Sequence, residues 1–347
     1  MIKKIKLTNF RKFKNLDLDI DKNIVVFYGN NAQGKSSILE SIYLITKGKS
    51  PWTIETEDYV NTEQIEGEKY TRIMIMDDDT EYSFYKSGNK RLLKINNSNT
   101  TPSKFFANTA SVIFSPEQIE ILMISSTKRR DFLDEIISTV DYTYIETLKN
   151  FRKVLKQRNA YLKKLAKKFY DSGIIARNDP QLNFWTQQFV DLSKIILKKR
   201  QEIIKDMVID SLHLEYVKSN GSTDLEEAVE NAKRRDIATG CTNIGPHRDD
   251  WNIIDGKNIK KFGSRGEKRL AIGKLIFKKQ EIIKKSLNYY PILLLDDIAS
   301  ELDQKNTEKI FNKEIIDKQQ TFIAIINKDD LPKDILDNAQ LFNLNDL

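Results

Sequence analysis

One segment near the amino terminus constrains the fold of this 347-residue chain more than any other feature. Residues 24–28 (Ile-Val-Val-Phe-Tyr) form a continuous run of β-branched and aromatic residues, which is typical of a buried strand. From Lys35 onward, apolar residues recur at helical spacing. The intervening residues 29–36 (Gly-Asn-Asn-Ala-Gln-Gly-Lys-Ser) match the pattern G-x-x-x-x-G-K-[ST]. The sequence therefore predicts a phosphate-binding loop between a strand and a helix.

The residue types in this loop suit a nucleoside triphosphate with a magnesium ion. The glycines let the backbone curl so that successive N–H groups point at phosphate oxygens, and the helix start adds the positive end of its dipole. Lys35 is expected to reach the β- and γ-phosphates as a catalytic residue, and Ser36 to hold Mg²⁺. The expected nucleotide-binding residues of the loop are Gly29, Asn30, Asn31, Ala32, Gln33, Gly34, Lys35, Ser36 and Ser37.

A second nucleotide motif lies far along the chain. Residues 292–295 (Ile-Leu-Leu-Leu) form an apolar run that ends in Asp296 and Asp297. Asp296 is expected to bind in the Mg²⁺ shell, and Asp297 to orient the attacking water as a base. Because 255 residues separate Ser36 from Ile292, a lobe has been inserted between two halves of one nucleotide-binding core. This split is the plan of ABC-type ATPase heads, whose nucleotide is ATP.

That plan predicts a third element before the second motif. Residues 264–267 (Ser-Arg-Gly-Glu) open a predicted helix, and small residues at a helix amino terminus suit a γ-phosphate. In ABC-type heads this helix faces the nucleotide of a second subunit. We therefore expect Ser264, Gly266 and Glu267 to bind ATP across an ATP-dependent homodimer.

Composition excludes several other classes of protein. One cysteine (Cys241) and two histidines (His213 and His247) exclude a disulfide framework and argue against a Cys/His zinc site. No apolar run reaches 18 residues, so no membrane-spanning helix is predicted, and the first residues lack the apolar core of a signal peptide. We expect a cytoplasmic protein without a membrane partner.

Positive charge is concentrated in the middle of the chain. Residues 128–205 carry 18 Lys or Arg and 9 Asp or Glu, whereas the rest of the chain carries 39 and 41. Within residues 148–170 there are nine basic residues and no acidic one. Two interpretations remain open, a solvated helix face and a nucleic-acid footprint.

The hydrophobic pattern predicts an α/β fold with three parts. Residues 1–125 are expected to form the amino-terminal half of an ATPase head with a β meander, residues 126–235 a helical lobe built on an αα-hairpin, and residues 236–347 the carboxy-terminal half of the head. Strands are predicted at residues 5–7, 16–20, 24–28, 70–76, 81–85, 91–95, 111–114, 251–254, 258–262, 291–295 and 322–326. Helices are predicted after the phosphate loop, from residue 128 to the break at 171–180, at 185–203, 225–235 and 266–286, and near 303–317.

Several of these motifs stand in the order seen in one bacterial family. They are "LTNFRKFKNLDLDI", "GNNAQGKSSILESI", "VIFSPEQIEIL", "KRRDFLD", "GPHRDDW", "SRGEKR" and "LLLDDIASELD". In this order the chain resembles the RecF family of recombination mediators over about residues 1–330. The resemblance implies an ABC-type head with a short helical lobe, slow ATP hydrolysis coupled to dimerisation, DNA binding at single-strand gaps and duplex junctions, and RecO and RecR as partners.

The resemblance also implies roles for single residues. Arg11 matches an arginine that can approach the nucleotide, although a surface arginine is an equal alternative. Gln118 stands where such heads place a residue that senses metal and water, a catalytic role for which Glu117 competes. Asp303 belongs to a loop that crosses the dimer interface, and Asn327 takes the switch position, where it can contact the γ-phosphate without carrying charge.

Two positions depart from the family pattern or lack a role. Ala32 replaces a glycine, which is acceptable if its φ stays negative. His247 and Arg248 belong to the family's "GPHRDD" segment, either as a buried structural pair or as ligand contacts.

Two other protein classes remain as alternatives. An ABC transporter ATPase subunit is disfavoured by the inserted helical hairpin and by the missing Leu-Ser-Gly-Gly signature and switch histidine. An architectural head like those of SMC and Rad50 proteins would carry hundreds of heptad residues, whereas helices of about 40 residues, roughly 60 Å, are the longest that fit here.

Overall fold

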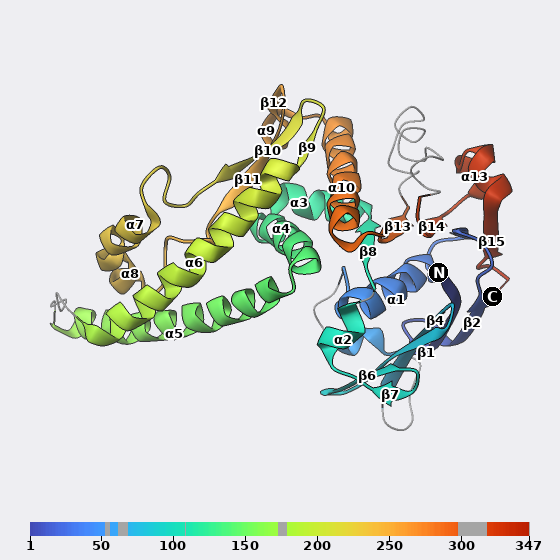
Figure 1. Cartoon of the computed structure of the whole chain (residues 1–347), viewed down its shortest axis with the longest axis horizontal. Coiled ribbons are helices and arrows are strands. Elements are labelled where there is room, and N and C mark those ends of the chain that lie inside the picture. Colours follow the sequence, from blue (N-terminus) through green and yellow to red (C-terminus); the bar gives the residue numbers. More distant parts are fainter. Residues whose placement is uncertain (53–55, 62–68, 108, 173–178, 298–317, 347) are drawn as a thin grey trace. The chain divides into compact units, whose positions relative to one another are not determined.

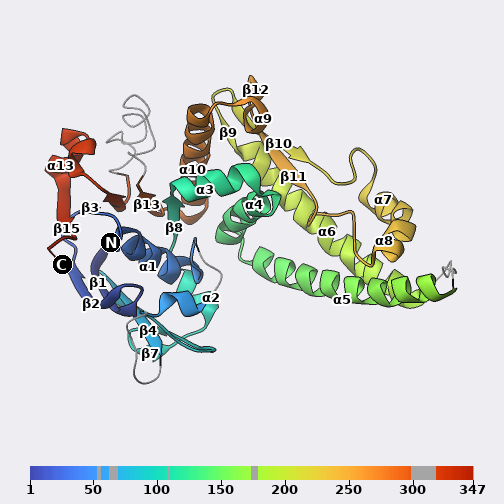
Figure 2. The same cartoon turned by 180° about the vertical axis from the view of Figure 1, so that it is seen from behind.

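The computed structural model describes residues 1–52, 56–61, 69–107, 109–172, 179–297 and 318–346. These residues form two compact units (Figures 1 and 2). The first unit comprises Met1–Ile119 and Leu287–Leu347, and the second comprises Glu120–Ser286. Among the described residues, no helix combines the length and apolarity needed to span a bilayer.

A parallel sheet forms the centre of the first unit. Its strands β3 (Ile24–Tyr28), β8 (Ser111–Phe114), β13 (Ile292–Asp296), β14 (Thr321–Ile325) and β15 (Ala339–Asn343) lie in the order β15-β3-β14-β13-β8. All neighbours pair in parallel, so the carboxyl ends of strands from both ends of the chain meet at one edge. The residues of β3, β8, β13 and β14 are almost entirely buried, as the continuous apolar runs predict, whereas most residues of the edge strand β15 are not.

An antiparallel sheet completes this unit. Strands β1 (Ile2–Phe10), β2 (Phe13–Asp19), β4 (Tyr70–Asp77), β5 (Thr80–Ser87), β6 (Lys90–Ile95) and β7 (Ser98–Asn99) lie in the order β2-β1-β4-β5-β6-β7. The predicted meander over residues 70–95 is confirmed by the pairing of β4, β5 and β6. Helix α1 (Lys35–Lys47) contacts strands of both sheets and shares their hydrophobic core. Short elements are η1 (Thr56–Tyr59), α2 (Pro102–Ala107), η3 (Lys328–Asp330) and α13 (Lys333–Asn338).

The second unit is built on a helical hairpin and a small sheet. Helices α5 (Thr143–Ser172) and α6 (Pro180–Asp206) run side by side (Figure 1), which confirms the predicted hairpin. Strands β9 (Val208–Ile209), β10 (Leu212–Val217), β11 (Asp250–Asp255) and β12 (Lys257–Asn258) form an antiparallel sheet. The remaining helices are α4 (Ser126–Val140), α7 (Leu225–Asn231), α8 (Lys233–Thr239), α9 (Ile259–Phe262) and α10 (Arg265–Leu287), and the chain passes from the first unit to the second within α3 (Pro116–Ile124).

Three details of the second unit differ from the predictions. The helical run from residue 128 breaks at Asp141, whose extended backbone ends α4 and whose carboxylate accepts hydrogen bonds from the N–H and hydroxyl of Thr143. Residues 259–262 form helix α9 and not a strand, because the Asn258 side chain caps α9 through the Lys261 N–H. Strand β10 was not predicted, although its buried Leu212 and Leu214 alternate with exposed residues.

The carboxy-terminal boundary of the helical lobe also differs from the predicted one. Residues 236–286 lie in the second unit, past residue 235 where the sequence placed the end of the lobe. The cause is that β11 pairs with β10 from His213 to Val217, so the chain after residue 235 completes the lobe before it returns to the head. The helix predicted near 303–317 lies outside the described residues.

Candidate functional site

The phosphate loop begins directly after β3 and ends where α1 begins. Gly29 has a φ of 138° and Gly34 a φ of 90°, backbone conformations that favour glycine. A Cβ atom on Gly34 would lie 2.6 Å from Cζ of Phe13 and 2.8 Å from Cδ of Lys12. Gly34 is therefore required both by its backbone and by the turn between β1 and β2 that packs against it.

The ammonium group of Lys35 holds the loop closed. Its Nζ donates to the carbonyl oxygens of Gly29 and Asn30, each at 2.7 Å. Only 7% of the residue is exposed, and burial lowers the pKa of Lys35, while the nearby charges of Asp297 and Asp296 oppose this effect. The two aspartates therefore lie close enough to Lys35 to stabilise its charge.

The two nucleotide motifs meet across 260 residues of sequence. The Ser36 hydroxyl donates to Oδ1 of Asp296 at 2.9 Å. Asp296 ends β13, and the N–H of Asp297 donates to the Ala324 carbonyl of β14. Serine and carboxylate oxygens are ligands that Mg²⁺ accepts, so Ser36 and Asp296 fit the magnesium site expected from the sequence.

Ala32 does not satisfy the condition set for it. Its φ is 63°, in the left-handed region, so the position does not keep the negative φ that would make alanine an easy replacement for glycine. The Ala32 carbonyl accepts a hydrogen bond from Nζ of Lys12 at 3.2 Å, and the Gln33 side chain accepts another at 2.8 Å. Lys12 is not among the residues that the motifs single out. The only feature of the sequence that could have indicated a role for Lys12 near the loop was its position next to Arg11.

Arg11 is not a free surface residue, because it forms an ion pair with a buried carboxylate. Its Nε and Nη2 donate to the two carboxylate oxygens of Glu40, each at 2.7 Å, and Glu40 on α1 is only 2% exposed. This hydrogen bonding raises the pKa of Arg11. The arginine thus ties the turn between β1 and β2 to α1, beside the loop.

The remaining residues predicted for this unit are only partly defined. Asn327 follows β14 and accepts the Asp329 N–H at 3.1 Å, which caps η3. Gln118 lies in α3, and only the backbone of this residue is described. Asp303 lies outside the described residues.

The predicted signature residues lie in the second unit. Ser264 and Glu267 form a capping box at the start of α10: the Ser264 N–H donates to Glu267 Oε2 at 2.7 Å, and the Glu267 N–H donates to the Ser264 hydroxyl at 3.2 Å. Lys257 lies 2.8 Å from Glu267, and its hydrogen bond lowers the pKa of Glu267 to about 2. A Cβ atom on Gly266 would meet no atom within 4 Å.

The "GPHRDD" segment forms buried interactions within the second unit. His247 lies against Phe151 and Phe189, and its Nε2 donates to the Thr242 carbonyl at 3.0 Å. Burial lowers the pKa of His247 to about 4. Arg248 is exposed, with Nε 3.4 Å from the same carbonyl. His247 is therefore a structural residue in this unit, whereas Arg248 is not part of a buried pair.

The carboxylates of the same segment join it to its surroundings. Asp250 accepts two hydrogen bonds from Arg129, at 2.6 and 2.8 Å. Asp249 accepts hydrogen bonds from the Tyr216 hydroxyl at 2.9 Å and the Ser219 N–H at 2.7 Å. The segment thus connects α4 to β10 and the chain that follows it.

The basic stretch 148–170 contains two kinds of residue. Arg158 is 1% exposed and donates to Asp236 and Thr242, at 2.9 and 2.6 Å, so it is structural. The others are exposed on α5: Lys149, Arg152, Lys153, Lys156, Lys163, Lys164, Lys167 and Lys168. A solvated face and a nucleic-acid footprint are both consistent with these positions.

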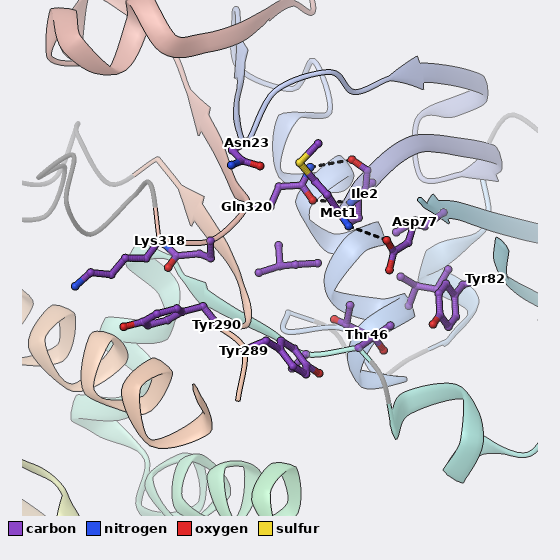
Figure 3. Close-up of a pocket in the computed structure, with 16 residues that line it drawn as sticks. Met1, Ile2, Asn23, Thr46, Asp77, Tyr82, Tyr289, Tyr290, Lys318 and Gln320 are labelled. Atoms are coloured by element: carbon purple, nitrogen blue, oxygen red, sulfur yellow. Dashed lines mark hydrogen bonds and ion pairs between the residues drawn. The ribbon is translucent and has the colours of Figure 1, made fainter. Parts of the chain in front are cut away.

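A cavity of about 480 Å³ lies in the first unit away from the phosphate loop (Figure 3). It is lined by Asn23, Ala110, Ile292 and Gln320, which lie at the amino ends of β3, β8, β13 and β14, and by Tyr82, Tyr289 and Tyr290. Both polar groups of the Gln320 amide bond to the backbone of Ile2, at 2.8 Å each. Because the loop follows the carboxyl end of β3, this cavity is not the nucleotide site.

Comparison with known proteins places the chain in a family. The model of the "RecF/RecN/SMC N terminal domain" matches residues 1–339. "DNA replication and repair protein RecF" of Clostridium kluyveri is 38% identical over 358 residues, which cover 98% of this chain and 97% of that protein. The protein of the same name from Clostridium acetobutylicum is 33% identical over 360 residues, covering 99% and 97%. This chain belongs to the RecF family.

Solved structures agree with this assignment. A structure described as the recombination mediator protein RecF-ATPrS in the RecFOR pathway matches with a TM-score of 0.80 and 28% identity, over 96% of this chain and 94% of that one. The Smc head domain of Pyrococcus furiosus matches with a TM-score of 0.50 and 16% identity, over 99% and 93%, and supports the fold alone. The prediction of an ABC-type ATPase head with mixed α/β structure is confirmed.

Proposed function

We propose that this chain binds ATP with Mg²⁺ in the phosphate loop and hydrolyses it slowly. The observation that carries the proposal is the hydrogen bond between Ser36 and Asp296, which brings the two nucleotide motifs together beside Lys35. A solved relative of 28% identity and a TM-score of 0.79 is described as RecF-ATP, which supports ATP as the nucleotide.

Each residue of the site has a separate role in binding or hydrolysing the nucleotide. The loop amides and Lys35 neutralise phosphate charge, while Ser36 and Asp296 hold the magnesium ion, which when bound neutralises charge on the phosphates. Asp297 orients the attacking water, and its left-handed backbone, with a φ of 46°, turns it out of the strand direction. Asn327 offers a neutral hydrogen bond near the γ-phosphate, which is consistent with slow turnover. Gln118 takes the role of sensing metal and water.

We further propose that two copies enclose the nucleotide. Ser264, Gly266 and Glu267 of one copy face the ATP bound by the other, and Asp303 crosses the interface. The Ser264 N–H now bonds to Glu267, so this amide must exchange its partner when it binds phosphate. The open space beside Gly266 leaves room for that approach.

DNA is the proposed target of the ATP-bound dimer. Relatives carry the name DNA replication and repair protein, and a solved relative is described in the RecFOR pathway. We therefore propose action at single-strand gaps or duplex junctions in the cytoplasm, with RecO and RecR as partners. The exposed lysines of α5 are the proposed contact with phosphates.

The decisive test is binding of the purified chain to single-stranded, duplex and gapped DNA across a salt series, with and without ATP. Each phosphate neutralised on duplex contributes about −0.9 to the slope of log K against log salt. Replacing Lys163, Lys164, Lys167 and Lys168 with alanine should flatten that slope. Replacing Lys86, Lys90, Lys94 and Lys104 of the first unit gives a control with the same change in charge. If the wild type does not bind DNA, with or without ATP, the proposed function is wrong.

A further inference from the structure

The segment that follows β15 crosses the start of the phosphate loop. Strand β15 pairs with β3 as far as Asn343 and Tyr28, and the N–H of Leu344 then donates to the Tyr28 carbonyl at 2.9 Å. Leu344 is only 3% exposed, which anchors the segment in the core. The next residue, Asn345, is therefore held beside Gly29 and Asn30.

Asn345 makes two close contacts with the first residues of the loop. Its Oδ1 accepts the N–H of Asn30 at 3.2 Å. A Cβ atom on Gly29 would lie 3.2 Å from the same oxygen, so glycine allows this close approach. The Asn345 N–H donates to the Asn343 side chain at 3.2 Å, which fixes the turn that presents Asn345 to the loop.

One peptide group connects Asn345 to Lys35. The N–H of Asn30 and the carbonyl of Gly29 belong to the same planar peptide unit. The N–H bonds to Asn345, while the carbonyl accepts from Nζ of Lys35 at 2.7 Å. Because the unit is planar and is held at both ends, Asn345 fixes the direction from which the Gly29 carbonyl meets the lysine.

We propose that Asn345 is a positioning residue for Lys35. It orients the Gly29–Asn30 peptide, and this peptide places the ammonium group that binds the nucleotide phosphates. The inference rests on the proposed function of Lys35 in ATP binding. Asn345 would thus belong to the nucleotide site through one hydrogen bond, although it lies more than three hundred residues from the loop in the sequence.

The test uses two substitutions and one matched control. Asn345→Ala removes the acceptor, and Asn345→Asp keeps an acceptor oxygen at the same position. Asn338→Ala is the control, because Asn338 is also an exposed asparagine near β15, but its side chain bonds to the Asp334 carbonyl. Two quantities are measured for each variant: hydrogen exchange of the Asn30 amide by NMR without nucleotide, and the Kd for ATP.

Asn345→Ala should speed exchange of the Asn30 amide and raise the Kd for ATP by about fivefold to tenfold, the effect of one lost hydrogen bond. Asn345→Asp should keep the amide protected, and Asn338→Ala should change neither quantity by more than about twofold. The positioning role would be overturned if Asn345→Ala sped exchange of the Asn30 amide without changing the Kd for ATP. It would also be overturned if Asn345→Ala left exchange of this amide unchanged. If the wild type failed to bind ATP, the proposed function would fall, while amide exchange would still report on the peptide.

Discussion

The phosphate loop and the "GPHRDD" segment are both rich in polar groups, but they use these groups in opposite ways. In the loop, Lys35 bonds to backbone carbonyls and Ser36 to a single carboxylate oxygen, all neighbours that a phosphate or a metal ion could replace. In the segment, Pro246 and Asp250 accept from arginines that are almost completely buried. The groups of the first arrangement could exchange these neighbours for a ligand, whereas the carboxylates of the second are already paired within their unit. A conspicuous motif can therefore mark either a binding site or a structural joint.

The largest expected effect comes from breaking the buried charges around the segment. Arg200 donates to both carboxylate oxygens of Asp134, at 2.8 Å each, and to the Pro246 carbonyl at 2.6 Å. Arg200→Met leaves Asp134 buried without its charged partner, with only the Tyr144 hydroxyl among the described residues still donating to it, and should lower the free energy of unfolding by about 3–5 kcal/mol, measured by urea denaturation. Lys199→Met is the matched control, because its ion pair with Asp141 is partly exposed and contributes about 1 kcal/mol or less. Equal losses in the two variants would contradict the comparison.

A substitution in the loop should affect binding more than stability. Lys35→Ala removes a charge that bonds only to loop carbonyls in the described structure, so the free energy of unfolding should change little. ATP binding should weaken by about 2–3 kcal/mol, roughly 30- to 150-fold in Kd, as titration calorimetry would measure. A variant that unfolds easily but binds ATP normally would show that Lys35 is structural.

The stability of the second unit should depend on pH through His247. Its pKa is about 4 in the folded chain and about 6.5 when unfolded, so the unfolded state binds more protons between these values. Stability is therefore lost as pH falls through this window, by about 2 kcal/mol between pH 7 and pH 5. His247→Gln should remove that part of the slope of unfolding free energy against pH. An identical slope in the variant would mean that His247 is not held neutral by burial.

The smallest effect concerns strain in the loop. Ala32 adopts a φ of 63°, which costs an L-residue about 1–2 kcal/mol relative to glycine. Ala32→Gly relieves this strain but makes the unfolded chain more flexible, so we expect a net gain of about 1 kcal/mol or less in unfolding free energy. A clear loss of stability on thermal denaturation would show that the left-handed backbone is not strained.

The sequence predicted the parts of the fold that local pattern controls. The apolar runs of β3, β13 and β14 and the glycine spacing of the loop are visible in the residues themselves. The bond between Ser36 and Asp296 could be expected from two known motifs, although they lie 260 residues apart. Strands β7 and β9, which have two residues each, were missed, as were β10 and β15, which pair with strands far along the chain, β11 and β3.

The contacts of single side chains were the least predictable. Nothing local indicates that Arg11 pairs with Glu40, that Lys12 bonds to the Ala32 carbonyl, or that Asn345 reaches the loop, because each depends on where another element packs. The positive φ of Ala32 was missed for the same reason. Its left-handed backbone is supported by Lys12 from a different part of the chain.

The contrast between the two regions can be measured directly by amide hydrogen exchange, with and without a non-hydrolysable ATP analogue and Mg²⁺. If the loop is the ligand site, amides of residues 31–36 should exchange more slowly with the analogue, because their N–H groups donate to phosphate oxygens, whereas those of Gly29 and Asn30 already donate to Ile326 and Asn345. Amides of residues 245–250 should exchange at the same rate in both conditions. Slower exchange in residues 245–250 with no change in the loop would contradict the account.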